Sequence, residues 1–261
     1  MPKSEGAVRR DGKHGRIYFI PEMEKVWKPE GELKAGEAYS VTTKLGALGK
    51  GEGLMHWAAK IQADAAIELS TEWAVADRRI LRQGVDEYIR DGLKGKAKWV
   101  RERDKAANLG TRVHEYCEEF IKGSGKAAVL RERMTPEEEV AVVAFREWVD
   151  RENVEFLGSE VACYTTGLRC AGTYDYDAEV RDVKIIGDFK TSKAIYREAR
   201  LQLSFYAAAH GSAQMGVINR LPKKKGDKGE VFTMWTSDLQ EHFEAFSKVS
   251  DCFDALLTVP K

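Results

Sequence analysis

The chain has 261 residues, 43% of them hydrophobic, which is enough for one large domain or for a domain with a helical elaboration. Lysine and arginine together number 42, as do aspartate and glutamate, so the whole-chain charge argues neither for nor against a nucleic-acid partner. No apolar run approaches the roughly 20 residues that span a bilayer, and the amino terminus lacks the apolar core of a signal peptide. We therefore expect a soluble, cytoplasmic protein without a membrane partner.

The amino-terminal third combines short polar segments with helices. Residues 1–15 are polar and rich in glycine, and we expect them to fray. Arg16 to Ile20 is a strand candidate that ends at Pro21. A firmer helix is expected over 54–69, after a stretch rich in glycine. Three hydroxyl residues offer a helix N-cap before this stretch: Ser40, Thr42 and Thr43.

Two further helices, over 72–90 and 95–107, are predicted to be basic along much of their length. A solvated helical face is the commoner explanation for such a pattern. The alternative is one wall of a channel for a phosphate backbone, in which nearby tryptophans stack on bases, although tryptophans are more often core anchors. The residues concerned are Arg78, Arg79, Arg82, Lys94, Lys96, Lys98, Arg101, Arg103 and Lys105, with Trp57, Trp73 and Trp99.

The second half of the chain alternates helices with strands. Gly110 is expected to open a helix with a buried stripe, and Thr135 followed by Pro136 is a strong start for another. Strands are predicted at 159–165, 171–180 and 183–190, then a helix over 198–209, a hairpin of 215–220 with 231–236, and a helix over 237–257. This order predicts the α/β class with α+β character, a central mixed sheet flanked by helices, and a helical amino-terminal half. We expect residues 1–107 and 108–261 to be two regions of one compact unit.

The four cysteines are scattered, without a C-x-x-C motif. Cys163 and Cys170 lie on either side of a predicted turn and could face one another, but in a cytosolic protein we expect reduced, half-buried thiols. A zinc site or an iron–sulfur cluster needs closer ligand spacing. With Cys117 and Cys252 equally isolated, the sequence predicts no metal site built on thiolates.

Acidic residues fall where the predicted strands should bury apolar ones. Asp188 and Lys190 flank Phe189 directly after an apolar run, so both leave the strand on the same face. Asp175 lies on the preceding strand. A carboxylate and an ammonium group side by side at a strand end cost free energy unless a cation or a phosphate joins them. This arrangement indicates a metal or phosphate site.

Four short motifs in succession carry a resemblance to a known group of enzymes. G-T-R-V-H at 110–114, G-T-Y-D at 172–175, D-F-K at 188–190 and Q-L-S-F-Y at 202–206 occur in order and in fitting secondary structure. Together they resemble the motifs of RecB-type nucleases of the PD-(D/E)XK superfamily, which includes phage recombination exonucleases and CRISPR-associated RecB-like nucleases. The earlier S-V-T-T segment is similar to the opening of some phage members. The resemblance covers roughly residues 108–236 and implies a restriction-endonuclease-like core in the second region. The basic helices of the first region would then form the helical DNA channel.

The resemblance also implies a divalent-metal site for phosphodiester hydrolysis. This reaction needs a cation that polarises the phosphoryl oxygen and lowers the pKa of a water molecule. Mg²⁺ prefers oxygen ligands, so Asp175 and Asp188 suffice as its protein anchors, and the family implies the Phe189 carbonyl oxygen as a third. The family implies His114 as a further ligand, and its imidazole would make Mn²⁺ a good substitute. Lys190 would hold or deprotonate the attacking water and offset charge in the transition state.

Three further residues complete the predicted catalytic set. Gln202 and Tyr206 are four positions apart on a helix and share a face, and in the family such a pair lines the site. Without the other motifs, Tyr206 would be read as a core aromatic residue. Glu160 matches the acidic residue on the family's first core strand, although an exposed strand carboxylate would look identical. Other charged residues compete for a role: Asp177 and Glu179 as metal ligands, and Lys193 and Arg197 as phosphate ligands.

The expected function is that of a Mg²⁺- or Mn²⁺-dependent deoxyribonuclease. An exonuclease acting on DNA ends in phage-type recombination or repair is favoured, in the host cytoplasm if a phage encodes it. A structure-specific or flap endonuclease, or a non-catalytic nucleic-acid-binding protein on the same fold, are the alternatives. The basic helices and the loop Lys223-Lys224-Lys225 would contact the phosphates of single- or double-stranded DNA.

Further expectations follow from the resemblance. Several RecB-like nucleases carry an iron–sulfur cluster held by downstream cysteines, but here only Cys252 follows the core, so no such cluster is expected. The sequence has no helicase motif, so unwinding driven by ATP would need a partner. A single-strand annealing or recombination partner protein, and an oligomeric state, are both compatible with the resemblance.

Overall fold

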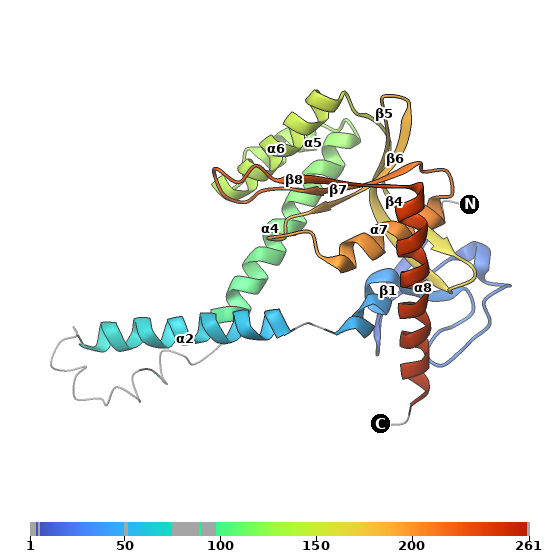
Figure 1. The fold of residues 1–261 in the computed structure, drawn as a ribbon, viewed down its shortest axis with the longest axis horizontal. Helices are drawn as coiled ribbons and strands as arrows, with labels where there is room; N and C mark the ends of the chain where they lie inside the picture. Colours follow the sequence, from blue (N-terminus) through green and yellow to red (C-terminus); the bar gives the residue numbers. More distant parts are fainter. Residues whose placement is uncertain (1–3, 5, 50–51, 75–88, 90–97, 260–261) are drawn as a thin grey trace. The chain divides into compact units, whose positions relative to one another are not determined.

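The computed structural model describes residues 4, 6–49, 52–74, 89 and 98–259, and the chain forms two compact units (Figure 1). One unit combines Met1–Leu48 with Gly110–Lys261, and the other is Gly49–Leu109. The division after Leu109 lies close to the expected boundary between residues 107 and 108, but residues 1–48 belong with the later region and not with the helical one. Strand pairing explains the difference, because the amino-terminal strands join the same sheet as the later strands and bring residues 1–48 into the first unit.

One mixed sheet of eight strands organises the first unit. Its order is β1-β2-β3-β5-β6-β7-β8, and β4 pairs with β5 beside this path. The β3–β5 and β6–β7 pairs are parallel, and the other pairs are antiparallel. The strands are β1 (Val8–Gly12), β2 (Gly15–Phe19), β3 (Glu37–Ser40), β4 (Glu155–Thr165), β5 (Cys170–Val180), β6 (Val183–Lys190), β7 (Met215–Arg220) and β8 (Glu230–Trp235).

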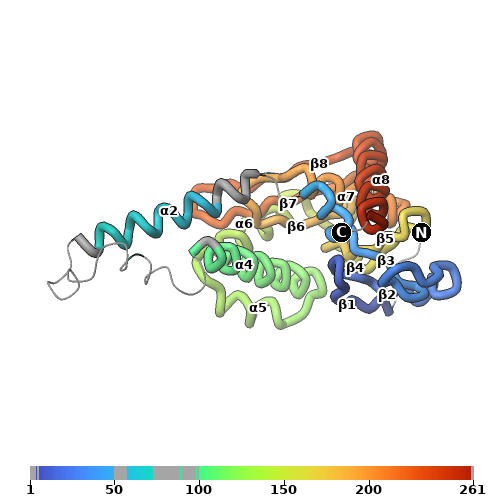
Figure 2. The backbone as a smooth tube through the Cα atoms, turned by 90° about the horizontal axis from the view of Figure 1, so that it is seen from below, coloured from blue at the N-terminus to red at the C-terminus, as the bar shows by residue number. Residues whose placement is uncertain are grey.

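The α-helices are α1 (Val41–Leu45), α2 (Glu52–Ala74), α4 (Lys98–Ile121), α5 (Lys126–Arg131), α6 (Pro136–Glu152), α7 (Arg197–His210) and α8 (Thr236–Thr258). Helices flank the sheet of the first unit, which makes the fold mixed α/β, as the order of elements predicts (Figures 1 and 2). On one face, Ile186 of β6 belongs to a buried cluster with Leu203 of α7 and Phe246 of α8. On the other face, the ring of Phe189 lies 5.3 Å from that of Phe145 in α6.

Alternation along β6 follows from this packing. Phe189 is 1% exposed and is surrounded by aromatic rings, so its neighbours Asp188 and Lys190 project from the opposite face of the strand. The predicted sharing of one face by these two residues is therefore confirmed. The packing of Phe189 against Phe145 and Tyr176 therefore fixes the orientation of β6, and with it the face from which Asp188 and Lys190 project.

The secondary structure predicted for the second half is largely confirmed. The three predicted strands correspond to β4, β5 and β6, and the predicted hairpin corresponds to β7 and β8. The start of α6 also follows the prediction. The Thr135 hydroxyl accepts from the Glu138 N–H, and the Glu138 carboxylate accepts from the Thr135 N–H at 2.8 Å, which forms a capping box.

Three local predictions need correction. Residues 8–12 do not fray but pair with β2, where Val8 lies opposite Phe19. The helix expected to open at Gly110 instead continues through this glycine within α4. A glycine fits there because a Cβ atom would lie 3.0 Å from the Thr191 hydroxyl oxygen, in the loop after β6. The short helix α5 was not expected.

Part of the predicted basic surface cannot be compared with the structure. Residues 75–88 and 90–97, which include several of the basic positions, lie outside the described residues, as do the side chains of Trp57, Trp73 and Trp99. Within the second unit, Lys98 Nζ pairs with a Glu68 carboxylate oxygen at 2.6 Å. This lysine therefore has a carboxylate partner in its own unit.

Candidate active site

A split in the sheet creates the cavity that holds the predicted residues. Along one edge, β5 pairs with β4 from Cys170 to Glu179. Along the other edge it pairs with β3 only at Cys170 and Ala171, and with β6 from Tyr176 onwards. The segment 172–175 therefore faces an opening between β3 and β6. A cavity of about 200 Å³ lies here.

All seven side chains of the predicted catalytic and metal-binding set line this cavity, six from the four motifs and Glu160 in addition. They come from α4, β4, β5, β6 and α7, which are far apart in sequence. The close approach of the Tyr206 ring explains the glycine in G-T-Y-D, because a Cβ atom at Gly172 would lie 2.7 Å from this ring. The seven residues are His114, Glu160, Asp175, Asp188, Lys190, Gln202 and Tyr206.

Asp175 occupies the centre of the polar contacts. Its Oδ2 atom accepts a hydrogen bond from the Phe189 N–H at 2.6 Å and lies 3.4 Å from His114 Nδ1. Burial alone would raise the pKa of Asp175, but His114, Lys190 and the Phe189 N–H together hold this pKa below its usual value. Burial opposes the charged form of His114, yet the carboxylates of Asp175 and Asp188 raise its pKa.

Glu160 faces Asp175 across the β4–β5 pair. The flanking pairs, Ser159 with Tyr176 and Val161 with Tyr174, place Glu160 opposite Asp175. Its φ of 52° lies in the left-handed region, which is unusual for glutamate and is typical of constrained functional sites. The residue as a whole is exposed, but burial of its carboxyl group, followed by the charge of Asp175, raises the pKa of Glu160 to about 7.

A chain of hydrogen bonds orients Lys190. Its Nζ atom lies 2.5 Å from Asp188 Oδ2 and donates to Gln202 Oε1 at 3.1 Å. Gln202 Nε2 in turn donates to the Tyr206 hydroxyl at 2.7 Å. Burial raises the pKa of Asp188 to about 6 despite the opposing effect of Lys190, and Asp188 raises the pKa of Lys190 against burial. The paired residues of α7 therefore fix the position of the lysine.

The residues that could hold a cation differ in part from the predicted set. One ligand atom from each of His114, Glu160 and Asp175 lies within 4.8 Å of the other two. Asp188 lines the same cavity, but its Oδ2 atom is engaged by Lys190. The Phe189 side chain is buried on the other face, and its backbone meets the cavity through the N–H bond to Asp175. Two facing carboxylates with one imidazole form a donor set that fits a divalent cation.

The competing charged residues do not line the cavity. Asp177 is 3% exposed, and its Oδ2 atom lies 3.4 Å from Nε2 of His210 at the end of α7. Glu179 lies opposite Glu155 near the far end of β5. Arg197 contacts Glu198 at the surface, and Lys193 is exposed.

Sequence reasoning missed part of the lining of this cavity. Arg9 of β1 and Arg16 of β2 line it, together with Ser40, Thr42 and Thr173. The Ser40 hydroxyl also accepts from a backbone N–H of α1, so the S-V-T-T segment acts as a helix cap there. Arg9 gave no signal because residues 1–15 read as a frayed terminus, and Arg16 lay in a predicted strand whose pairing was not specified.

Comparisons with known proteins add little to this geometry. No known family matches the sequence, and neither does any curated protein. Among solved structures, one titled "Crystal structure of SSO0001" shares 14% identity, with 57% of this chain and 77% of that chain covered and a TM-score of 0.31. A likeness this low carries no argument about fold or function. Among the described residues, no helix has the length and apolar character to cross a membrane.

Proposed function

We propose that this protein is a divalent-metal-dependent deoxyribonuclease of the RecB type, with a PD-(D/E)XK core. One observation carries the proposal. Residues from four separate motifs, chosen by their resemblance to those of RecB-type nucleases, line a single cavity and are joined in part by hydrogen bonds. Chance D-x-K triplets would not bring a histidine, a second carboxylate strand and a glutamine–tyrosine pair to the same place.

The donor set fits Mg²⁺ or Mn²⁺. His114, Glu160 and Asp175 would hold the cation, with Asp188 on the same wall. A bound cation of this kind polarises a phosphoryl oxygen and lowers the pKa of a water molecule. Burial, followed by the charge of Asp175, raises the pKa of Glu160, and a cation bound between the two carboxylates would favour the ionised form of Glu160.

Lys190 would act next to the scissile phosphate. Held by Asp188 and Gln202, its ammonium group would orient the attacking water and offset the negative charge that develops on the phosphoryl oxygens. Tyr206 supports Gln202 and is therefore a positioning residue. Hydrogen bonds of this kind restrict the lysine to one orientation, which favours catalysis by preorganisation.

Arginine and hydroxyl side chains in the same cavity support a phosphate-containing substrate. Arg9 and Arg16 offer guanidinium donors, and Ser40 and Thr42 offer hydroxyls, within the same cavity as the carboxylates. Guanidinium groups bind phosphates in a bidentate manner. A cavity that combines possible ligands for a cation with donors for an anion suits a phosphodiester. DNA ends remain the favoured substrate, and exonuclease activity the favoured reaction, because the motifs resemble those of phage recombination exonucleases.

Cleavage assays test the proposal. Wild-type protein with Mn²⁺ is expected to degrade linear DNA, and Lys190→Ala is expected to abolish degradation while Lys193→Ala, outside the cavity, retains it. Absence of cleavage by the wild type on any DNA would favour the non-catalytic binding protein. Linear and covalently closed circular DNA with labelled ends separate the two nuclease classes, since rapid cutting of the closed circle would indicate an endonuclease.

A further inference from the structure

The hairpin loop 222–229, between β7 and β8, carries positive charge that the candidate active site does not use. It contains four lysines and one aspartate. Lys224, Lys225 and Lys228 are exposed, and among the residues that the structure describes they have no carboxylate partner. Exposed lysines without partners are available to an anion in solution.

The loop is held in one conformation by its aspartate. Arg220 donates to Asp227 twice, from Nη1 at 2.9 Å and from Nη2 at 2.8 Å. The Gly229 N–H donates to Asp227 Oδ1 at 3.0 Å, and the Asp227 N–H donates to the Lys224 carbonyl at 3.1 Å. This bidentate pair neutralises Arg220, so the net positive charge of the loop resides on its lysines. A fixed loop loses little conformational entropy on binding.

The loop leaves the sheet beside the active site. Lys190 and Arg220 are paired in the parallel β6–β7 ladder, and both are the last residues of their strands. The Leu221 N–H donates to the Lys190 carbonyl at 2.7 Å. The carboxyl ends of parallel strands meet at one edge of a sheet, so the loop begins at the edge that presents Lys190.

Like charges are close together within the loop. Burial, followed by the charge of Lys224, lowers the pKa of Lys223. Repulsion between neighbouring ammonium groups is relieved when an anion binds between them. The phosphates of a nucleic-acid strand supply closely spaced negative charges, and their contacts with lysine release counter-ions.

We propose that the 222–229 loop is a preorganised binding surface for a sugar–phosphate backbone, which Lys224, Lys225 and Lys228 hold at the Lys190 edge of the sheet. The proposal rests on the proposed nuclease function for the identity of the polyanion. The three lysines are outside the cavity, so they set the affinity for the strand and not the rate at which a bound strand is cleaved.

Equilibrium binding of a fluorescent oligonucleotide, as a single strand and as a duplex, tests the surface in EDTA, where no cleavage occurs. The variant Lys224→Gln/Lys225→Gln/Lys228→Gln is compared with Lys25→Gln/Lys28→Gln/Lys248→Gln, which removes the same charge from exposed lysines elsewhere. The loop variant is expected to bind at least about tenfold more weakly and to lose about 2 from the slope of log affinity against log salt. The control variant is expected to keep the wild-type slope, and equal slopes in all three proteins would overturn the proposal.

A second measurement separates this proposal from the nuclease function. At saturating DNA with Mn²⁺, the loop variant is expected to cleave bound strand at the wild-type rate, and a matching loss of this rate would overturn the separation of binding from chemistry. If the wild type cleaves nothing, the nuclease function fails while the binding result still stands. Binding of the loop to vesicles of anionic lipid without binding to the oligonucleotide would also overturn the assignment to nucleic acid.

Discussion

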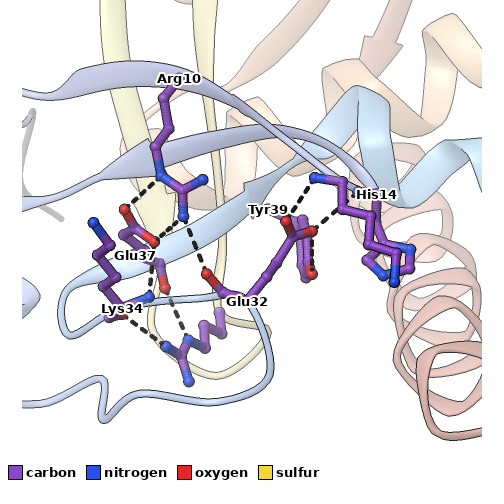
Figure 3. A network of polar contacts seen from close by, with 8 residues as sticks. Arg10, His14, Glu32, Lys34, Glu37 and Tyr39 are labelled. Carbon is purple, nitrogen blue, oxygen red and sulfur yellow. Dashed lines mark hydrogen bonds and ion pairs between the residues drawn. The ribbon is translucent and has the colours of Figure 1, made fainter.

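Two clusters of charged residues in the first unit differ in how their charges are compensated. In the amino-terminal cluster, Glu37 is buried but accepts from Arg10 Nε and from the Lys34 N–H, each at 2.7 Å (Figure 3). These contacts, Arg10 foremost, lower the pKa of Glu37. In the active-site cavity, Glu160 instead faces another carboxylate, Asp175, and its pKa is raised to about 7 by burial and then by that charge.

The second carboxylate of the amino-terminal cluster, Glu32, is also paired with hydrogen-bond donors. Glu32 accepts from the backbone N–H groups of Lys13 and His14 and from the Tyr39 hydroxyl, at 2.6, 3.0 and 2.9 Å (Figure 3). Burial opposes the charged form of Glu32, but these bonds hold its pKa below the usual value. A network with matched partners stabilises the fold without any ligand, whereas facing carboxylates create a requirement for one. The first cluster therefore contributes to stability, whereas the second is the one for which we propose a ligand.

The largest expected effect concerns the cavity. Asp175→Asn keeps the shape of the side chain and an acceptor for the Phe189 N–H but removes the charge that faces Glu160. We expect cleavage to fall by more than about a hundredfold, and the thermal unfolding midpoint to fall moderately, because the charge that pairs with His114 and Lys190 is lost while the protein stays folded. Cleavage rates and thermal unfolding of the purified variant measure these two effects.

Asp177→Asn is the matched control, because Asp177 lies two positions along β5 and outside the cavity. It is expected to retain cleavage. An inactive Asp177→Asn protein that remains folded would move the metal site away from Asp175.

The second effect is stabilisation by the cation. Because the folded cavity brings together three ligands that are separated in the unfolded chain, Mn²⁺ at about a hundred times its Kd should add about 2.7 kcal/mol to the free energy of unfolding. Chemical denaturation with MnCl₂ and with EDTA measures this difference. Glu160→Gln should reduce it, whereas Glu179→Gln, outside the cavity, should not. An unfolding free energy that is equal with and without Mn²⁺ would argue against a site at His114, Glu160 and Asp175.

The residues of the cavity differ in how far the sequence alone could predict them. Asp175, Asp188 and Lys190 could be predicted because each lies in a short motif on a strand that the alternation of residues also indicates. Glu160 could be named only as a match to the family's first core strand. Its place opposite Asp175 could not be predicted, since it depends on the register of β4 against β5. The contribution of Arg9 was also invisible, because it depends on a hairpin of short polar strands at the amino terminus.

Long-range pairing also limited the prediction of the fold. The order of strands and helices from 155 onwards is local information, and the sequence predicted it well. The parallel contact of Ser40 with Ala171 joins segments that are far apart, and residue patterns alone do not specify such pairs. For this reason the sequence did not indicate that residues 1–48 join the later region, where β3 belongs to the sheet that contains the site.

The third effect concerns the amino-terminal cluster. Glu37→Gln removes the charge that pairs with Arg10, whose side chain is 36% exposed, so solvent screens part of the loss. We expect a destabilisation of about 1–2 kcal/mol with cleavage at low temperature unchanged. Urea denaturation measures the difference. Glu30→Gln is the control, because Glu30 pairs with Arg169 while its own side chain is 79% exposed, and its loss should have little effect. Equal destabilisation by both substitutions would remove the distinction between a buried network and a surface ion pair.

The smallest expected effect is the pH dependence of the stability difference between the wild type and Glu37→Gln. The pKa of Glu37 is lower in the folded protein than its ordinary value of 4.5. Between these two values the unfolded chain binds more protons, so the stability that Glu37 contributes is fully present above pH 4.5 and is lost as the pH falls through the folded pKa. The stability difference between the wild type and Glu37→Gln, measured by urea denaturation at a series of pH values, should therefore shrink in acid. A difference that stays constant down to the lowest pH at which the protein folds would mean that the carboxylate acts through shape and not through its charge.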